Sequence, residues 1–318
     1  MKRFVLIDGH AILHRAFHAL PPLTSAKGET VNAVYGFFAM LLKILEDVKP
    51  EYLAICFDRP KPTFRQELYV GYQAHRPKMD SDLVPQIVLL HKVLERIKIP
   101  IFEVDGYEAD DVIGTLADRI QKSKIKNQKL QTIIVSGDRD MLQLVNSHVL
   151  VLAPITGITK MILFDQEKVE EKYGLKPSQI IDYKALIGDP SDNYPGVLGV
   201  GPKTAAELLL KYETLENLYQ NLDSVENKKL VEKLAKEAEA AGMAKKLATI
   251  ITDAPITLSI EKCLVSKVDL EETKKAFEEL GFKSLLKRLG QNSSDSVAKE
   301  EQKPKETQNK DNGQLGLL

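Results

Sequence analysis

Nine carboxylates could do chemistry together, because they form five short clusters that each adjoin an apolar run, a helix start or a Gly-rich turn. They are Asp8, Asp58, Glu108, Asp110, Asp111, Asp138, Asp140, Asp189 and Asp192. Like charges held close together cost free energy unless bound cations or protons offset them. A ligand set made only of oxygen favours Mg²⁺ or Mn²⁺. The pattern therefore predicts a divalent-cation site.

Each cluster also has a structural alternative when it is taken alone. Asp110 and Asp111 could cap a helix and interact with its dipole. Asp58, Asp138 and the acids of GDPSDN could belong to ordinary turns. Independent turns would not all require anions at one edge of a sheet, so the five clusters together favour a functional site.

The elements that must position these acids alternate along the chain. Four short apolar runs are candidates for buried strands: residues 4–7, 52–57, 132–135 and 149–152. Runs with helical spacing lie between them, at residues 31–48, 83–97 and 110–121. This alternation predicts an α/β fold with a mostly parallel sheet covered by helices on both faces. Ligands bind at the carboxyl ends of such strands, which Asp8, Asp58 and Asp138 follow.

Phosphodiester hydrolysis is the chemistry that suits such a site. Two Mg²⁺ ions about 3.5–4 Å apart activate a water and stabilise the leaving oxygen. The ions supply the nucleophile and the charge stabilisation, so no serine or histidine nucleophile is required. We accordingly expect no metal-binding group among the six histidines.

The composition says more about the cellular location of the protein than about its function. The net charge of −1 over 318 residues leaves the class of partner open. The two cysteines, Cys56 and Cys263, lie too far apart for a disulfide framework or a zinc motif. We expect no signal peptide, because Asp8 interrupts the apolar run near the start, and the longest apolar stretch, residues 33–42, is too short to span a membrane. We expect a monomeric cytoplasmic protein without a membrane partner.

A segment at residues 60–82 interrupts the alternation of strands and helices. Its basic and aromatic residues are Arg65, Tyr69, Tyr72, Arg76 and Lys78. Long excursions inside a compact domain are usually functional or disordered. Basic side chains interleaved with aromatic rings suit a single strand of nucleic acid. A solvated loop is the alternative.

A Gly-rich turn follows the last acidic cluster and contains Gly199, Gly201, Lys203 and Thr204. It does not match a P-loop, because Pro202 stands between the glycine and the lysine. As a hairpin between two helices, it would let backbone N–H groups approach a DNA phosphate, with Lys203 adding charge and Thr204 capping the next helix. Such binding contacts only the nucleic-acid backbone and is independent of base sequence. The alternative is a plain Gly-rich turn.

Three parts are expected along the chain. They are an α/β core at residues 1–178, a helical subdomain at 179–290 and a polar, disordered tail at 291–318. Within the helical part we expect a helix at 228–252, a short strand at 256–260 and a helix pair at 269–289.

Several motifs, taken in order, resemble the 5′ nuclease of bacterial DNA polymerase I, a member of the flap endonuclease superfamily. They are LIDGH, AVYGF, CFDRPKPTFRQELY, GYEADD, SGDRDMLQL and DYKALIGDPSDNYPGVLGVGPKTA. The resemblance implies a PIN-like core, a helical arch over the site and a helix-3-turn-helix (helix-hairpin-helix) that grips duplex DNA. It also implies metal-dependent 5′-3′ exonuclease and 5′-flap endonuclease activity on flaps, nicks and RNA primers, in primer removal and DNA repair.

The resemblance also implies roles for individual residues. The ligands nearer a first ion would be Asp8, Asp58, Glu108 and Asp110. Those nearer a second ion would be Asp111, Asp138, Asp140, Asp189 and Asp192. The cations that approach the phosphates would be Arg15, Arg65 and Arg76. The turn at residues 199–204 would hold the downstream duplex, where a K⁺ ion often sits.

Two departures from the family pattern affect the nucleic-acid contacts. Gln73 stands where the family has a lysine, so Arg76 or Lys78 would have to compensate, or turnover would be lower. His14 stands where a stacking aromatic is expected, and imidazole stacks on a base more weakly. We retain His14 and Tyr72 as candidate DNA contacts, and Arg65, Arg76 and Lys78 as candidate catalytic cations.

The C-terminal end carries a further expectation. No polymerase sequence follows, which indicates a stand-alone nuclease, and the peptide from Gln314 to Leu318 resembles those that dock on the bacterial sliding clamp. Such a tether would raise the effective concentration of the nuclease at nicks. A random apolar end or a chain cut before a polymerase is the alternative.

Two other classes of function compete with the nuclease. One is a non-catalytic module that binds structured DNA, but backbone binding alone would be served better by neutral or basic residues than by clustered acids. The other is an RNA-directed PIN-type ribonuclease, which the hairpin and the long excursion disfavour.

Overall fold

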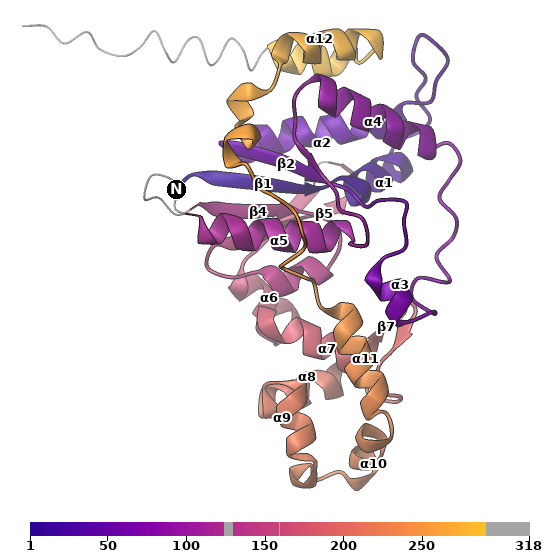
Figure 1. Cartoon of the computed structure of the whole chain (residues 1–318), viewed down its shortest axis with the longest axis vertical. Coiled ribbons are helices and arrows are strands. Elements are labelled where there is room, and N and C mark those ends of the chain that lie inside the picture. The colour runs from indigo at the N-terminus through magenta and orange to yellow at the C-terminus, as the bar shows by residue number, and fades with distance from the viewer. Residues whose placement is uncertain (124–129, 159, 291–318) are drawn as a thin grey trace, which may run out of the picture.

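The computed structural model describes residues 1–123, 130–158 and 160–290. A six-stranded sheet forms its centre, with the strand order β3-β2-β1-β4-β5-β6 (Figure 1). Neighbouring strands are parallel, except that β6 is antiparallel to β5. The strands are β1 (Arg3–Asp8), β2 (Tyr52–Cys56), β3 (Ile101–Phe102), β4 (Gln131–Val135), β5 (Val149–Thr156) and β6 (Lys160–Phe164).

The parallel register brings the carboxyl ends of the central strands to one edge. Ile7 of β1 pairs with Ile55 of β2 and with Val135 of β4. Each of these strands is an apolar run that is buried over nearly its whole length, as expected for a parallel sheet covered on both faces. The predicted α/β fold is confirmed, and the four predicted strands correspond to β1, β2, β4 and β5.

Helices cover both faces of the sheet (Figure 1). On one face lie α1 (Gly9–Ala19), α2 (Asn32–Val48) and α4 (Val84–Arg96). On the other lie α5 (Ala109–Lys122) and α6 (Gln166–Tyr173). Large side chains such as Phe37 and Leu116 are fully buried in these two layers, and each contributes roughly 1.5–3 kcal/mol to stability. The result is a sheet packed on both faces behind the acidic edge.

A helical lobe extends the sheet domain at the bottom of Figure 1 and has its own apolar core. It begins with a two-stranded ribbon of β7 (Gly188–Asp189) and β8 (Tyr194–Pro195), which follows α7 (Ile180–Ile187). The remaining helices are α8 (Pro202–Tyr212), α9 (Leu215–Gln220), α10 (Lys228–Lys236) and α11 (Ala238–Ala248).

The prediction of a single helix at residues 228–252 is wrong in detail, because two helices, α10 and α11, take its place. The chain leaves helical geometry at Glu237, with φ −102° and ψ 18°, and this break separates α10 from α11. The break lets Leu234 and Ala241 both pack into the core of the lobe. Glycine and proline are absent from residues 228–241, so the local sequence carries no breaker signal.

The last part of the described chain returns to the sheet domain. α12 (Leu270–Glu279) and a helix at residues 283–290 pack beside α2 and α4, where Phe277 and Phe282 join the core around Phe38. Residues 179–290 therefore contribute to the core of the lobe and to the cores on both faces of the sheet. The strand expected at 256–260 does not form, because Ile256 and Leu258 anchor an irregular segment onto the α5 layer.

The excursion at residues 60–82 is less helical than the predicted arch. It contains α3 (Phe64–Leu68), followed by turns. Its tip docks on the helical lobe, because the Gln73 backbone N–H donates to the Asp192 carbonyl at 2.8 Å and Asn193 Nδ2 donates to the Gly71 carbonyl at 2.7 Å. The segment thus links the sheet edge to the lobe.

Two further expectations concern the whole chain. Within the described residues, no helix is long and apolar enough to cross a membrane. The predicted tail at residues 291–318, with its clamp-binding peptide from Gln314 to Leu318, lies outside the described residues.

Candidate metal and nucleic-acid site

Asp8 ends β1 and caps the helix that follows. Its Oδ1 accepts a hydrogen bond from the Ala11 backbone N–H at 2.9 Å, and its Oδ2 accepts one from the Ser136 hydroxyl at 2.8 Å. The first bond satisfies a free N–H at the start of α1. The second ties the end of β1 to the end of β4. Asp8 is therefore fixed by local structure while it lines the cleft.

Asp58 follows β2 and is fixed by the neighbouring helix in the same way. Its Oδ1 accepts a hydrogen bond from the Ala109 backbone N–H at 2.8 Å, at the first residue of α5. Nδ1 of His10 lies 3.2 Å from the other carboxylate oxygen. Burial alone would raise the pKa of Asp58, but the hydrogen bond and charge of His10 hold it below its usual value. Asp58 is therefore ionised at neutral pH.

The acids around the start of α5 are hard to ionise together. Burial raises the pKa of Asp8 to about 6, and repulsion from Asp58 adds to the shift. Burial also raises the pKa of Glu108 to about 7, although Arg65 opposes it. Burial and repulsion from Asp138 and Asp8 raise the pKa of Asp110 well above its usual value. A bound cation would offset both causes, and an all-oxygen donor set fits Mg²⁺ or Mn²⁺.

A second group of acids lies beside the ribbon of the helical lobe. Asp140, Asp189 and Asp192 each offer a carboxylate oxygen, and these atoms lie within 4.8 Å of one another. Lys184 contacts Asp140, and its Nζ lies 2.6 Å from Oδ2 of Asp189. Arg76 donates from Nη2 to Oδ1 of Asp192 at 2.6 Å. These oxygens also fit a hard divalent cation, with the two basic side chains as competitors for them.

Both groups open into one cleft of about 1410 Å³. Asp138 connects them, because its Oδ1 accepts a hydrogen bond from the Asp140 backbone N–H at 2.8 Å. The predicted acids that line the cleft are Asp8, Asp58, Glu108, Asp110, Asp138, Asp140 and Asp192. Asp189 does not line the cleft, but its carboxylate lies within 4.8 Å of those of Asp140 and Asp192, which do. The structure thus brings eight of the nine acids to one place, as the sheet topology predicts.

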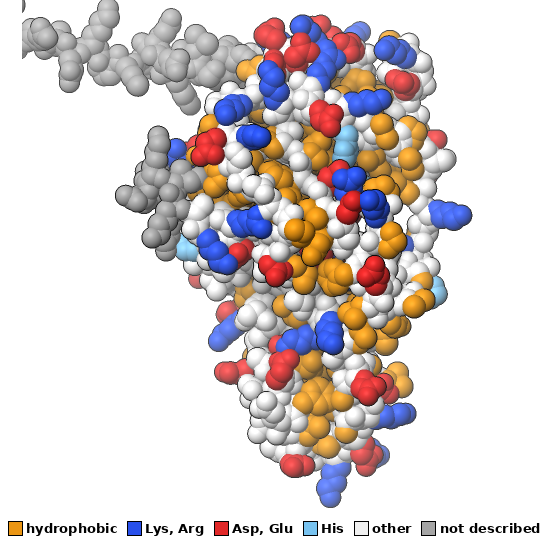
Figure 2. Space-filling view, in the orientation of Figure 1, with side chains coloured by type: hydrophobic (Ala, Val, Ile, Leu, Met, Phe, Trp, Pro, Cys, Tyr) orange, Lys and Arg blue, Asp and Glu red, His pale blue; other side chains and the backbone are white. Residues whose placement is uncertain are grey.

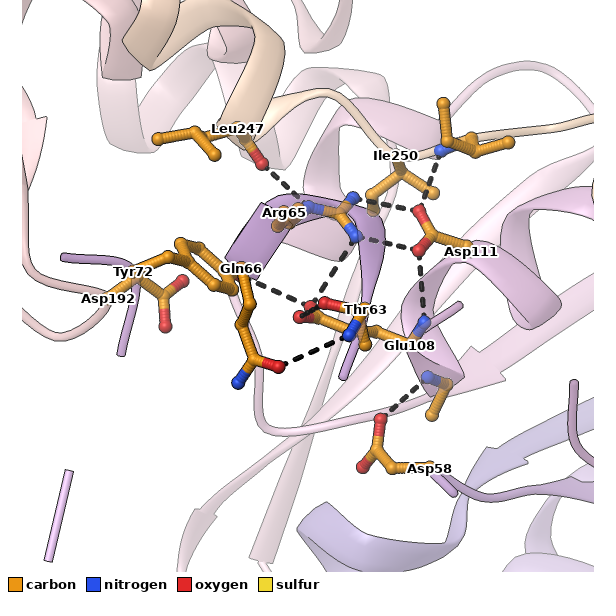
Figure 3. Close-up of polar contacts among 12 residues, drawn as sticks. Asp58, Thr63, Arg65, Gln66, Tyr72, Glu108, Asp111, Asp192, Leu247 and Ile250 are labelled. Atoms are coloured by element: carbon orange, nitrogen blue, oxygen red, sulfur yellow. Dashed lines mark hydrogen bonds and ion pairs between the residues drawn. The ribbon is translucent and has the colours of Figure 1, made fainter. Parts of the chain in front are cut away.

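Asp111 is the exception, and its placement does not fit the expected ligand role (Figure 3). It is fully buried, and its two oxygens accept hydrogen bonds from Arg65 at 2.6 and 2.8 Å. The backbone N–H groups of Glu108 and Ile251 donate to the same carboxylate at 3.1 and 2.9 Å. With both oxygens engaged in this way, we reassign Asp111 to a structural role.

The placement of Arg65 also does not fit its expected role, which was to contact a phosphate. Its side chain is 3% exposed, and the guanidinium also donates to the carbonyl oxygens of Leu247 and Thr249, at 2.9 and 2.8 Å. It therefore joins the excursion, α5 and the end of α11 (Figure 3). We reassign Arg65 as a structural cation that holds the lobe against the sheet domain.

The other basic candidates are more accessible. Arg76 is half-exposed beside Asp192, and Lys78 is exposed. Arg15 lines the cleft and donates from Nε to the Gly157 carbonyl at 2.8 Å. Gln73, which replaces the family's lysine, donates from Nε2 to Asp192 Oδ1 at 3.2 Å. Gln73 therefore binds an acid of the second group.

The two candidate stacking residues differ from expectation. Tyr72 is buried, its ring lies near that of Tyr194, and its hydroxyl donates to Glu108 Oε2 at 3.1 Å. In this conformation it orients a carboxylate and presents no face to a base. His14 is exposed, but its ring lies against that of His18, one helical turn later on α1. Two of the six histidines, among which no metal-binding group was expected, thus lie in contact on α1.

The Gly-rich turn lies outside the cleft, at the start of α8. Gly199 has φ +80°, a left-handed conformation that side chains disfavour, and Gly201 is the N-cap of the helix. Pro202 occupies the first helical turn, where its missing N–H costs nothing. Lys203 is 91% exposed. The expectation that Thr204 caps α8 is wrong, because Thr204 lies inside the helix and Gly201 is its N-cap. An exposed helix start with a nearby cation can bind an anion.

Several side chains that contact the acids were missed at the level of sequence, among them His10, Ser136, Lys184 and Thr63. Lys184 was overlooked although it lies five residues before Asp189 in the same motif, which was the available signal. Thr63 donates from its hydroxyl to Glu108 Oε1 at 3.1 Å. Its role depends on a contact between residues 45 positions apart, for which the sequence holds no local signal.

Charge on the surface is mixed, in contrast to the cleft. On the face shown in Figure 2, acidic and basic side chains are interspersed over both the sheet domain and the lobe. This face therefore offers no broad basic surface to a nucleic acid. Positive charge near the cleft comes from individual side chains such as Arg76 and Arg15.

Comparison with known families matches both parts of the fold. The family model for the N-terminal, resolvase-like domain of 5′-3′ exonucleases matches residues 3–174, and that for their C-terminal SAM fold matches residues 175–271. The chain is 39% identical over 289 residues to a 5′-3′ exonuclease of Aquifex aeolicus, which covers 91% of the chain and 96% of the relative. It is also 43% identical over 295 residues to DNA polymerase I of Bacillus subtilis, and spans 33% of that relative's length.

Solved structures share the fold at low sequence identity. A flap endonuclease of bacteriophage T5 in a complex with DNA and metal ions superposes with a TM-score of 0.62 and 18% identity, covering 95% of this chain and 100% of that one. Human GEN1 in complex with Holliday junction DNA gives a TM-score of 0.61 and 14% identity, covering 96% and 76%. The fold thus combines a resolvase-like α/β domain with a SAM-fold domain, and the acidic cleft lies at the carboxyl edge of the sheet. The chain belongs to the 5′-3′ exonuclease family.

Proposed function

We propose that this protein is a metal-dependent 5′-3′ exonuclease and 5′-flap endonuclease that cleaves DNA with two divalent cations. One observation carries the proposal: two groups of carboxylates, on different elements, face one cleft at the carboxyl edge of a parallel sheet. Membership of the 5′-3′ exonuclease family supports the reaction class.

The residues around the cleft fit two Mg²⁺ or Mn²⁺ ions. Asp8, Asp58, Glu108 and Asp110 would hold one, and Asp138, Asp140, Asp189 and Asp192 the other. When bound, such ions supply an activated water and stabilise the leaving oxygen of the phosphodiester. The hydrogen bonds of Asp8 and Asp58 to helix starts keep their carboxylates in place without a rearrangement.

In this proposal, the basic side chains near the second group of acids have different partners before and after cations bind. Lys184 and Arg76 contact its carboxylates in the structure described here. Cations bound to the same oxygens would release Arg76, which is half-exposed and reaches the cleft, to contact a phosphate of the strand. Gln73 can donate a hydrogen bond to that strand but carries no charge, so we expect a modest turnover.

The helical lobe would hold the duplex beside the cleft. The exposed turn at Gly199 and Gly201 offers backbone N–H groups, and Lys203 adds a point charge. Both features act on phosphates, which fits recognition of DNA shape. We propose 5′ flaps, nicks and RNA primers as substrates, in primer removal and DNA repair, and K⁺ as an ion that the turn could hold.

Cleavage of a labelled 5′-flap duplex tests the proposal. The protein should release the flap with Mg²⁺, lose this activity with EDTA, and lose most of it in the Asp138→Asn variant. Asp118→Asn is the matched control, because Asp118 pairs with Lys122 on α5 and does not line the cleft. Cleavage in EDTA, equal loss in both variants, or no cleavage by the wild type with Mg²⁺ would refute the proposed reaction.

A further inference from the structure

Two histidines on α1 have an arrangement that the nuclease reaction does not use. His14 and His18 are four residues apart, which places them one above the other on a helix with 3.6 residues per turn. Their Nε2 atoms lie 3.2 Å apart, and the ring planes meet at 64°. Both side chains are exposed and line the same cleft.

The separation of the two nitrogens matches the requirement of a metal ion. Zinc binds imidazole nitrogen at about 2.0–2.1 Å, so two such ligands at a tetrahedral angle lie about 3.3–3.4 Å apart. Pairs of histidines at this helical spacing bind zinc in other proteins. Here the two nitrogens already face each other, and a single ion would replace the hydrogen bond between them.

The chemical state of the pair also suits a metal. A hydrogen bond between two imidazole nitrogens requires that at least one of them carries a lone pair. Partial loss of solvent around the ring, the neighbouring His18 and the charge of Arg76 all lower the pKa of His14. His14 is therefore neutral at physiological pH, which is the form that binds metals.

We propose that His14 and His18 form a two-nitrogen site for a divalent transition metal of the zinc, copper or nickel class at the mouth of the cleft. Imidazole favours these metals, whereas the carboxylates deeper in the cleft favour Mg²⁺ or Mn²⁺. The site is chemically distinct from the proposed catalytic ions, and its existence does not depend on the nuclease function. Its remaining coordination positions would face the cleft and accept water or another oxygen ligand.

A copper chelate with free coordination positions tests the site directly. Full-length protein is titrated with Cu²⁺–iminodiacetate in excess Mg²⁺, and the bound copper is followed by electron paramagnetic resonance. Iminodiacetate already supplies carboxylate ligands to the copper, so the remaining coordination positions report binding by imidazole nitrogens. We expect one tightly bound chelate per chain, with the signature of two coordinated imidazoles.

Three single variants locate the binding. His14→Gln and His18→Gln should each weaken binding by about tenfold or more and abolish the two-imidazole signature, because one of two linked ligands is lost. His75→Gln, an exposed histidine in the excursion, should leave both unchanged. Both helix variants alter exposed side chains, and circular dichroism verifies that they remain folded. A single-imidazole signal in the wild type, or binding that survives in His14→Gln and His18→Gln, would overturn the proposal.

Discussion

At the scale of single residues, the acids of this chain have two different jobs. Asp8 and Asp58 accept hydrogen bonds from helix starts yet still line the cleft. Asp111, which directly follows Asp110 in sequence, is withdrawn into a buried pair with Arg65. Neighbouring acids with the same sequence signature therefore differ in role because one of them has a buried partner.

The Arg65–Asp111 pair makes a prediction about stability. Arg65→Ala should lower the free energy of unfolding by about 3–5 kcal/mol, because it leaves a buried carboxylate without its partner. Lys122→Ala, which breaks an exposed pair with Asp118, should cost at most about 1 kcal/mol. Urea denaturation measures both. If Arg65→Ala keeps full stability but loses flap cleavage, Arg65 contacts the substrate and the reassignment fails.

The raised pKa values of acids in the cleft predict how the stability of the fold depends on pH. The folded-state pKa values of Asp8 and Glu108, about 6 and about 7, lie above the ordinary values of 3.8 and 4.5. Their protonated forms therefore stabilise the fold at low pH, and this contribution is lost as pH rises through the folded-state values.

The metal-free protein should accordingly melt at a lower temperature at about pH 8 than at about pH 5, and saturating Mg²⁺ should reduce this difference. The Glu108→Gln variant should show a smaller pH dependence, since one of the responsible groups no longer titrates. Differential scanning calorimetry in EDTA measures the effect. A melting temperature that rises steadily over this range would contradict the assigned pKa shifts.

At the scale of elements, the turn between α7 and the β7–β8 ribbon positions the second group of acids. Gly188 has φ +74°, and an added Cβ would collide with the backbone nitrogen of Gly196 and approach the Tyr194 carbonyl oxygen to 2.8 Å. Asp189 follows immediately. The glycine therefore fixes the path that brings Asp189 towards Asp140.

A pair of glycine substitutions tests whether the turn at Gly188 is constrained in this way. Gly188→Ala should lower the free energy of unfolding by more than about 1 kcal/mol, because the residue must stay at positive φ in a crowded turn. Gly242→Ala is the matched control, since among the described residues no neighbouring heavy atom lies within 4 Å of its added Cβ. That helical substitution should stabilise the protein by up to about 1 kcal/mol. Equal effects in thermal melting would show that the turn is not constrained as described.

The elements also show where sequence reasoning succeeds. The strands were predictable because a parallel sheet buries both faces, which leaves continuous apolar runs, and the acids beyond them follow from the topology. The break at Glu237 was not predictable, because it serves packing of Leu234 and Ala241 in a tertiary core. The role of Asp111 likewise depends on Arg65, which lies 46 residues away in sequence.

At the scale of the whole molecule, one cleft is assembled from the sheet edge, the excursion and the helical lobe. Arg65 joins all three, and the tip of the excursion hydrogen-bonds to the lobe next to Asp192. The second group of acids is therefore complete only when the lobe docks on the sheet domain, since Asp140 belongs to one and Asp189 to the other. The architecture thus brings two groups of anions to a single cleft.

The positions of bound Mn²⁺ ions give the sharpest test of whether the two groups of carboxylates hold two metal ions. Crystals of the protein soaked in Mn²⁺ would be measured near the manganese absorption edge, and anomalous difference maps would locate each ion. Two peaks are expected, one among Asp8, Asp58, Glu108 and Asp110 and one among Asp138, Asp140, Asp189 and Asp192. The absence of manganese from either group of carboxylates, or a peak on Asp111, would contradict it.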